Sequence, residues 1–303
     1  MKRSLVAETE QYVCYCRTVL FGSTNCYILV DKTAGEALLI DPGGDAAALI
    51  KALAELEARP ALIVNTHGHW DHIGANKALQ QHYGLDIAIH AADAPMLTDG
   101  AKNAARLFRG DGDGGKAGRL LADGDSVGLG QLRLQVLHTP GHTPDHCSPS
   151  VIYNDRTIFT FSGEAVGTVY TDDRILSTPT SMPPNFKFND YIASMSKVKN
   201  MKPEIMGLCH YGMITGESDI NFMIDDNFNF MHKFKEEIVN AFNENPSTEY
   251  VLSKTEYLWE GRTKDNPTDD EGKKAFLKNL RLALTYGVMV DLGLRKPKYE
   301  RKS

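Results

Sequence analysis

The chain has 303 residues and a formal net charge of -6, and its 42% hydrophobic and 24% charged residues are ordinary for a soluble globular enzyme. This length suits one large domain, or one domain with an appendage. Because no long run of lysine and arginine precedes the short basic tail, the composition argues against nucleic acid as a partner.

The N-terminal stretch lacks the unbroken apolar core of a signal peptide, and no apolar run is long enough to span a bilayer. The five cysteines have no CxxC spacing, which favours a reducing compartment. We therefore expect a cytoplasmic protein that does not act at a membrane.

Short segments rich in β-forming residues and bounded by turn residues predict the strands of the first half. They cover residues 12–20, 25–31, 36–44, 61–65 and 86–90. An amphipathic helix is expected from Asp45 to Pro60, and a second from about Ile73 to His82. The strand at 61–65 leads directly into Thr66–His72, so this polar cluster is expected on a loop at a strand end.

The second half begins with a glycine-rich segment, residues 109–118, which predicts a mobile loop and a cover for the site. Further strands are expected at 125–130, 131–139, 150–154, 157–163 and 204–210, and a helix at 189–200. From about Gly216 the pattern is mostly helical. The alternation predicts an α/β sandwich over residues 1–215 and a helical C-terminal appendage over residues 216–303.

The segment "THGHWDH" places His67, His69, Asp71 and His72 within six positions, although the chain has only ten histidines. Histidine and carboxylate together are the usual donors of a transition-metal site. A polar loop whose histidines cap a helix is the plainer alternative. The density of donors favours a metal site.

Three further donors follow predicted strands in distant parts of the chain. They are His142 in "HTPGHT", Glu164 in "FSGEA" and His210 in "GLCHYG". A binuclear site needs such donors from several segments, each placed at a strand end. The ordered set is therefore more specific than any single member.

From "TNCYILVD" and "LLIDPGG" through "THGHWDH", "HTPGHT" and "FSGEA" to "CHYG", the sequence resembles the metallo-β-lactamase-fold superfamily, in its glyoxalase-II-like branch. The resemblance covers roughly residues 20 to 215. It implies an αββα sandwich whose loops hold two metal ions at one edge. It assigns three residues to each ion: His67, His69 and His142 to the first, and Asp71, His72 and His210 to the second.

Glu164 departs from this pattern, because it stands where the family usually has an aspartate that bridges both ions. Its extra methylene lengthens the arm by about 1.5 Å. We expect it to reach both ions through a backbone shift at Ser162–Gly163, since glycine adopts conformations closed to other residues. Binding to one ion, a changed metal preference, or a surface position beside a degenerate site are the alternatives.

Several residues near the predicted ligands are either candidate site residues or purely structural residues. Asp41, at the end of a strand, is a candidate partner for a ligand histidine. His138 and His146 are interpreted as structural histidines. The hydroxyls of Tyr170 and Tyr211 are candidate donors to a substrate carbonyl, the alternative being tyrosines of the core or rim.

Two divalent ions that share a water lower its pKa toward neutrality, and the hydroxide then attacks a carbonyl or phosphorus. Hydrolysis of a small thioester, ester or lactone is the favoured function, with Asp71 orienting the nucleophile. An iron-dependent redox enzyme of the same fold, or a metal-binding regulatory protein without turnover, is the alternative. Zinc is favoured over iron or manganese. The expected partner is a small-molecule substrate, and a homodimer is compatible with the sequence.

Overall fold

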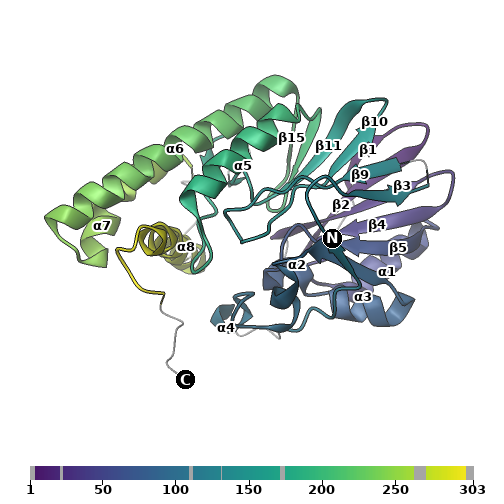
Figure 1. The fold of residues 1–303 in the computed structure, drawn as a ribbon, viewed down its shortest axis with the longest axis horizontal. Helices are drawn as coiled ribbons and strands as arrows, with labels where there is room; N and C mark the ends of the chain where they lie inside the picture. Colours follow the sequence, from purple (N-terminus) through teal and green to yellow (C-terminus); the bar gives the residue numbers. More distant parts are fainter. Residues whose placement is uncertain are drawn as a thin grey trace.

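The protein is described by a computed structural model for residues 4–20, 23–108, 112–130, 132–170, 175–262 and 271–297. Two β-sheets face each other, and helices cover both outer faces (Figure 1). The predicted αββα sandwich with C-terminal helices is therefore confirmed.

The first sheet has seven strands in chain order. They are β1 (Ser4–Glu8), β2 (Tyr12–Val19), β3 (Thr24–Asp31), β4 (Glu36–Ile40), β5 (Arg59–Val64), β6 (Asp86–His90) and β7 (Arg119–Leu121). Strands β1 to β4 pair antiparallel, and β4 to β7 pair parallel. The carboxyl ends of β4, β5 and β6 thus lie along one edge of the sheet.

The second sheet has the order β15-β14-β11-β10-β9-β8. Its strands are β8 (Ser126–Leu129), β9 (Leu132–Gln135), β10 (Ser150–Tyr153), β11 (Arg156–Gly163), β14 (Ile205–Leu208) and β15 (Met213–Thr215). A small third sheet joins β12 (Thr168–Val169) to β13 (Ser177–Thr178). The parallel pair β11 and β14 ends at the same edge, just before Glu164 and His210.

The helices fall into two groups. Those of the first half are α1 (Ala46–Glu55), α2 (Trp70–Ile73), α3 (Asn76–Tyr83), the 3-10 helix η2 (Ala94–Thr98) and α4 (Ala105–Phe108). Those of the second half are α5 (Phe188–Asn200), α6 (Glu217–Glu244), α7 (Thr248–Thr255), the 3-10 helix η3 (Glu256–Trp259) and α8 (Glu271–Asp291). In Figure 1, α1 and α3 lie against the first sheet, and α5 and α6 lie on the side of the second sheet.

Strand β3 shows why the sandwich has several apolar layers. Its side chains alternate between two clusters, because successive residues of a strand point to opposite faces. Cys26, Ile28 and Val30 pack with residues of α1 and α3. Tyr27 and Leu29 pack with residues of β9, β10 and β11 across the gap between the sheets. A strand buried on both faces reads as a continuous apolar run, which is why the sequence identified it.

The helix expected over residues 73–82 is divided. Helix α2 ends at Ile73 and α3 begins at Asn76. The division falls at Gly74, where a Cβ atom would lie 2.3 Å from the Gly43 carbonyl oxygen. Close packing of two backbones therefore overrides the helical pattern at this point.

The glycine-rich segment is only partly described, since residues 109–111 lie outside the described ranges. In the remainder, Gly114 packs against Ile73 of α2, and Gly118 lies beside Asp86 of β6. These contacts fix residues 112–118 against the first sheet and its helices. The mobility predicted for this segment, and its role as a cover for the site, stay predictions.

The C-terminal helices are tied to the segment between Glu164 and α5. Asp226 of α6 forms a two-point ion pair with Arg262, with Nη2 to Oδ1 at 2.9 Å and Nη1 to Oδ2 at 2.5 Å. Arg262 also donates to the Ser177 carbonyl, and Asn227 donates to the Val166 carbonyl. The appendage is thus packed onto the sandwich through buried and partly buried polar contacts as well as apolar ones.

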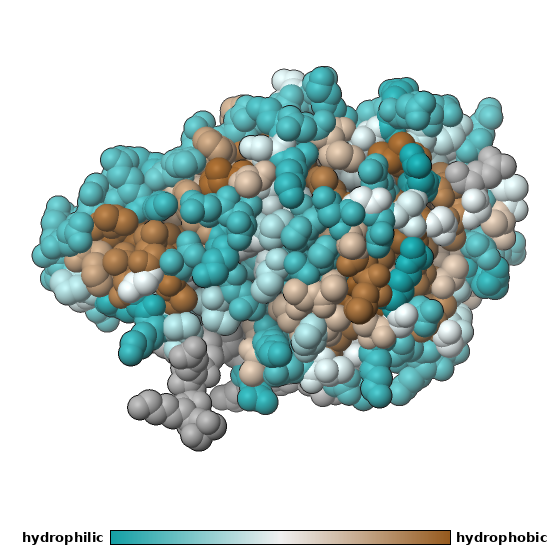
Figure 2. All heavy atoms as spheres, viewed as in Figure 1, coloured by the Kyte–Doolittle hydropathy of each residue, from teal (hydrophilic) through white to brown (hydrophobic). Residues whose placement is uncertain are grey.

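Apolar side chains also gather at the end of the molecule where α7 lies, seen in brown at the left of Figure 2. Tyr257 of η3 and Phe276 of α8 are each about half exposed. The homodimer stays a prediction.

Among the residues that the structure describes, no helix combines the length and the apolar character needed to cross a bilayer.

Candidate metal centre

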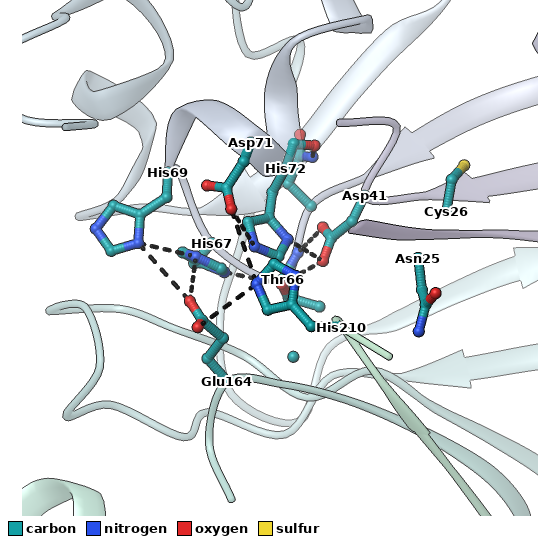
Figure 3. A network of polar contacts seen from close by, with 12 residues as sticks. Asn25, Cys26, Asp41, Thr66, His67, His69, Asp71, His72, Glu164 and His210 are labelled. Carbon is teal, nitrogen blue, oxygen red and sulfur yellow. Dashed lines mark hydrogen bonds and ion pairs between the residues drawn. The ribbon is translucent and has the colours of Figure 1, made fainter. Parts of the chain in front are cut away.

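The predicted ligands come together at one edge of the sandwich, and Figure 3 labels all of them except His142. The loop after β5 carries two of them and the short helix α2 that follows carries two more, and the loops after β9, β11 and β14 carry one each. The seven residues are His67, His69, Asp71, His72, His142, Glu164 and His210. Both sheets therefore contribute to one cluster, as the strand-end positions predicted.

Three histidines and the glutamate form the first half of the cluster. The Nδ1 atom of His69 lies 3.1 Å from His67 Nε2 and 2.9 Å from His142 Nε2. Glu164 Oε2 lies 3.3 Å from His67 Nε2 and also contacts His142 Nε2. The ligand atoms of all four lie within 4.8 Å of one another. This convergence suits one small ion bound at about 2.1 Å from each donor.

Asp71, His72 and His210 form the other half. Asp71 Oδ2 lies 3.7 Å from His72 Nε2 and 3.8 Å from His210 Nε2. The other oxygen of Glu164, Oε1, lies 3.8 Å from His210 Nε2. The two carboxylate oxygens of Glu164 thus face the two halves of the cluster, as Figure 3 shows. The bridging role stays a prediction, and this orientation is the one that it requires.

Four of the histidines have their outer ring nitrogen hydrogen-bonded, which leaves Nε2 directed at the cluster. The Nδ1 contacts are His67 to Thr66 Oγ1 (3.0 Å), His72 to Asp41 Oδ2 (3.1 Å), His142 to the Thr180 carbonyl (2.5 Å) and His210 to the Ser23 carbonyl (2.9 Å). Metal-binding histidines usually have such outer partners, which fix the tautomer and the ring orientation. The arrangement therefore fits metal ligands better than helix caps.

One buried atom tests this fit directly. His72 Nε2 is fully buried and has no hydrogen-bonding partner among the described residues. A buried polar atom without a partner costs about 1–3 kcal/mol, so such atoms are rare. A metal ion between His72, Asp71 and His210 would satisfy it.

Asp41 is the anchor behind His72. It is almost fully buried, and its Oδ1 accepts from the Thr66 backbone N–H at 2.8 Å. Its Oδ2 accepts from Thr66 Oγ1 at 2.6 Å as well as from His72. Burial lowers the pKa of His72, but Asp71 and Asp41 outweigh it and raise that pKa to about 9. The two carboxylates therefore stabilise a proton on this histidine, which a metal ion bound at Nε2 would displace.

The protonation states of the first half are those that metal ligands need. Burial lowers the pKa values of His67 and His69, which keeps both rings neutral. Burial also opposes ionisation of Glu164, but His142 and His67 outweigh it and hold the pKa of the carboxyl well below its usual range. Neutral imidazoles and an ionised carboxylate are the forms that coordinate a cation.

The backbone turn before Glu164 depends on Gly163 and His146. Gly163 has φ +52°, and a Cβ atom there would lie 2.3 Å from His146 Nε2. His146 Nε2 accepts the Glu164 backbone N–H at 3.0 Å, and its Nδ1 bonds to Thr139 Oγ1 at 2.9 Å. The structure therefore gives His146 a structural position that fixes the start of the glutamate arm. It also places a ladder irregularity between Phe161 and Gly163, at the predicted shift.

A second glycine admits the motif loop. A Cβ atom on Gly43 would lie 1.7 Å from the carbonyl oxygen of Asp71. The "DPGG" turn after β4 and the "HWDH" loop after β5 are therefore in backbone contact. This contact explains why glycine follows Asp41 so closely in the sequence.

Tyr170 and Tyr211 lie together beside the second half of the cluster, with ring centroids 4.8 Å apart. Tyr211 is 44% exposed and has φ +57°, an uncommon conformation for a residue with a side chain. Burial raises the pKa values of both phenols, and the neighbouring Tyr211 adds to this for Tyr170, as Asp71 does for Tyr211. Both hydroxyls therefore keep their protons near neutral pH. Substrate binding by either one stays a prediction.

The C-terminal helices contact the segment that orients His142. Thr180 accepts from His142 through its carbonyl and donates from Oγ1 to the Glu164 carbonyl at 2.7 Å. The next residue, Ser181, donates to the Leu284 carbonyl of α8 at 2.9 Å. The side-chain pattern gave no sign of Thr180, because it holds His142 through its backbone. Cys209, which groups with His72 and His210, was also missed as a site residue.

Comparisons with known proteins agree with this geometry. The family model described as the metallo-beta-lactamase superfamily matches residues 19–210. A hydroxyacylglutathione hydrolase GloC of Haemophilus influenzae is 34% identical over 124 residues, which are 40% of this chain and 58% of that protein. A probable metallo-hydrolase YqgX of Bacillus subtilis is 30% identical over 41% of this chain and 58% of its own length. The chain spans about 56–65% of the first curated relatives that it matches.

Solved structures give the same fold. The B3 metallo-beta-lactamase BLEG-1 is 28% identical, with a TM-score of 0.59 over 71% of this chain and 97% of that one. The archaeal superfamily protein ST1585 of Sulfolobus tokodaii is 18% identical, with a TM-score of 0.62 over 91% of this chain and 97% of that one. The latter supports the fold alone. Together with the matched family model, these findings show that the chain belongs to the metallo-β-lactamase superfamily.

Proposed function

We propose that the protein is a binuclear metal-dependent hydrolase of a small thioester, ester or lactone. The observation that carries the proposal is the position of Glu164, whose Oε2 faces the nitrogens of His67 and His142 and whose Oε1 faces His210 Nε2. The curated relatives named as a hydroxyacylglutathione hydrolase and a probable metallo-hydrolase support the reaction class.

In this proposal His67, His69 and His142 would hold the first ion, Asp71, His72 and His210 would hold the second, and Glu164 would contribute to both. Two bound divalent ions supply a nucleophilic water near neutral pH and stabilise negative charge on the attacked group. Asp71 is the more exposed of the two carboxylates, with 24% of its side chain accessible against 10% for Glu164. This exposure supports the proposal that Asp71 would orient the attacking water.

The tyrosine pair supplies the proposed contacts to the substrate. Both phenols stay protonated near neutral pH, so each can donate a hydrogen bond to the oxygen that gains charge. Removing one such donor costs about 3 kcal/mol, or roughly a hundredfold in rate. The partial exposure of Tyr211 gives a substrate a route to this donor.

The test assays a panel of small thioesters, esters and lactones with the wild type, His142→Ala, Tyr170→Phe and Tyr211→Phe. We expect His142→Ala to abolish turnover, and at least one phenylalanine variant to lose about a hundredfold. Turnover that survives His142→Ala would come from a contaminant. Phenylalanine variants that match the wild type would refute the tyrosine assignment.

Metal analysis of protein purified without added metal separates this proposal from the iron-dependent alternative. Two equivalents of zinc with turnover on the panel would support hydrolysis. Two equivalents of iron without hydrolytic turnover would support the redox alternative, which the glutamate in place of the family aspartate favours.

A further inference from the structure

A line of buried hydrogen bonds connects the C-terminal helix α6 to two of the proposed metal ligands. It starts at Asn227 of α6, passes through Tyr191 of α5 and then Thr180, and ends at Glu164 and His142. All five residues are buried, with exposed fractions of 8% or less. Figure 1 shows the two helices side by side. The line therefore runs through the interior, from the helical appendage into the sandwich.

The direction of every hydrogen bond in this line is fixed, because each hydroxyl has a single proton to donate. The Thr180 hydroxyl donates its proton to the Glu164 carbonyl at 2.7 Å. In its 3.0 Å contact with the Tyr191 hydroxyl it must therefore accept, so Tyr191 donates. The Tyr191 oxygen in turn accepts from the Asn227 side-chain amide at 3.1 Å. The line thus donates in one direction only, from α6 toward Glu164.

The Val166 carbonyl fixes the orientation of the Asn227 amide at the start of the line. Asn227 Nδ2 donates to this carbonyl at 2.7 Å. A flipped amide would place Oδ1 there, and two acceptors would then face each other. Oδ1 itself is buried without a hydrogen-bonding partner among the described residues, which destabilises the fold. An apolar side chain of the same size would avoid this loss, so stability alone does not explain an asparagine here.

Tyr191 also packs against the turn that presents His142. Gly141 has φ +126°, and a Cβ atom there would lie 2.3 Å from the backbone nitrogen of Tyr191. Lys187, just before α5, donates its backbone N–H to the Gly141 carbonyl at 2.7 Å. Burial raises the pKa of Tyr191, so the phenol keeps the proton that it donates to Thr180. The start of α5 therefore contacts both the residue before His142 and the residue behind its ring.

We propose that Asn227 and Tyr191 are positioning residues of the first metal group, which they hold in place through Thr180. Thr180 is the branch point, because its carbonyl accepts from His142 Nδ1 at 2.5 Å while its hydroxyl donates to the Glu164 carbonyl. Fixing Thr180 from both sides keeps the His142 ring with Nδ1 protonated and Nε2 directed at the proposed ion. The appendage thus contributes to the metal centre without supplying a ligand. The inference rests on the proposed metal centre and does not depend on the substrate.

The test uses full-length variants that each remove one link of the line. Tyr191→Phe and Thr180→Val remove one hydroxyl each, and Asn227→Leu removes the amide at nearly constant volume. Thr178→Val is the matched control, because Thr178 is buried two residues before Thr180 and donates to the Thr168 carbonyl at 3.1 Å. Thr180→Ser keeps the hydroxyl and is the conservative variant.

The first measurement follows the Nδ1 proton of His142 by NMR in metal-free protein with 15N-labelled histidine. The signal is identified as the one that is missing in His142→Ala. We expect this proton to exchange slowly with solvent in the wild type, the control and Thr180→Ser, and faster in Tyr191→Phe, Thr180→Val and Asn227→Leu. A general loss of stability would change the control as well, so the comparison isolates the orientation of the ring.

The second measurement titrates zinc into the stripped proteins in competition with a chromophoric chelator. We expect the three link variants to weaken one zinc-binding step by about 10-fold, and the control and Thr180→Ser to match the wild type. Unchanged proton exchange or unchanged affinity in all three link variants would overturn the positioning role, and so would an equal loss in the control. A wild type that binds no zinc would refute the metal centre itself, which is a different outcome. Circular dichroism identifies a variant that fails to fold, and the remaining link variants then decide.

Discussion

Replacing Asp41 with asparagine keeps the shape of the side chain but exchanges one acceptor for an N–H donor. In one orientation the new amide nitrogen faces His72 Nδ1, where the wild-type oxygen accepts at 3.1 Å. His72 Nδ1 must then accept a hydrogen bond from the amide, so it can carry no proton. A neutral His72 would carry its proton on Nε2, the atom predicted to bind metal. In the other orientation the amide faces the buried backbone N–H of Thr66. Either arrangement loses an interaction that the carboxylate makes.

The expected size of the effect follows from these contacts. A buried donor without an acceptor costs about 1–3 kcal/mol of folding free energy. Losing the outer partner of a ligand histidine lowers metal affinity by about 10–100-fold. We therefore expect Asp41→Asn to weaken binding of the second ion by that factor and to lower the free energy of unfolding of the metal-free protein.

Affinity is measured by competition with a chromophoric zinc chelator at pH 7, and stability by urea denaturation without metal. Asp31→Asn is the matched control. Asp31 is fully buried and is the last residue of β3, at the end of the strand away from the metal cluster. It accepts from the backbone N–H groups of Thr33 and Ala34, both at 2.7 Å. The control should lose stability but keep its affinity. Equal losses of affinity in the two variants would refute the role of Asp41 as an anchor for His72.

Glu164→Asp shortens the arm by about 1.5 Å, so we expect it to reach only one group of donors and to lose one metal equivalent by elemental analysis; a gain in occupancy would show that the glutamate does not bridge. Gly163→Ala places a methyl group against His146 and requires φ +52°, and should cost about 2 kcal/mol or more in urea denaturation. Burial holds the pKa of His146 below its usual value of about 6.5. The imidazole of His146 therefore stays neutral in the folded protein but binds a proton in the unfolded chain once the pH falls below about 6.5. The free energy of unfolding accordingly falls as the pH drops below about 6.5. His146→Gln should make this dependence shallower by up to about 1.4 kcal/mol per pH unit, and an unchanged slope would contradict the assignment.

The strand pattern and the position of the main site were predictable because both are encoded locally. Strand β3 is buried on both faces and reads as an apolar run, and four predicted ligands lie within a six-residue stretch, His67 to His72, shortly after β5. The partners behind the ligands were not predictable in this way. Thr180 acts through its carbonyl, and any residue type could supply that group.

Other features arise only when the two sheets meet. His90 and His138 read as ordinary histidines because nothing near either one in the sequence shows that their rings stack against each other. The contact between them exists because β6 and the loop after β9 belong to different sheets that share an edge. The division of the helix at Gly74 has the same origin, since the backbone that requires it belongs to the turn after β4.

The spread of the main cluster along the chain has a consequence for how the protein acquires metal during its synthesis. His67 leaves the ribosome long before His210, and most strands of the second sheet lie between them. Closing so long a segment costs chain entropy that only the paired sheets can offset. The complete donor set therefore forms after the sandwich has folded, unlike small zinc modules in which metal binding drives folding. Donors of this kind bind several divalent metals. The metal that binds therefore depends on which divalent ions are available once the protein has folded.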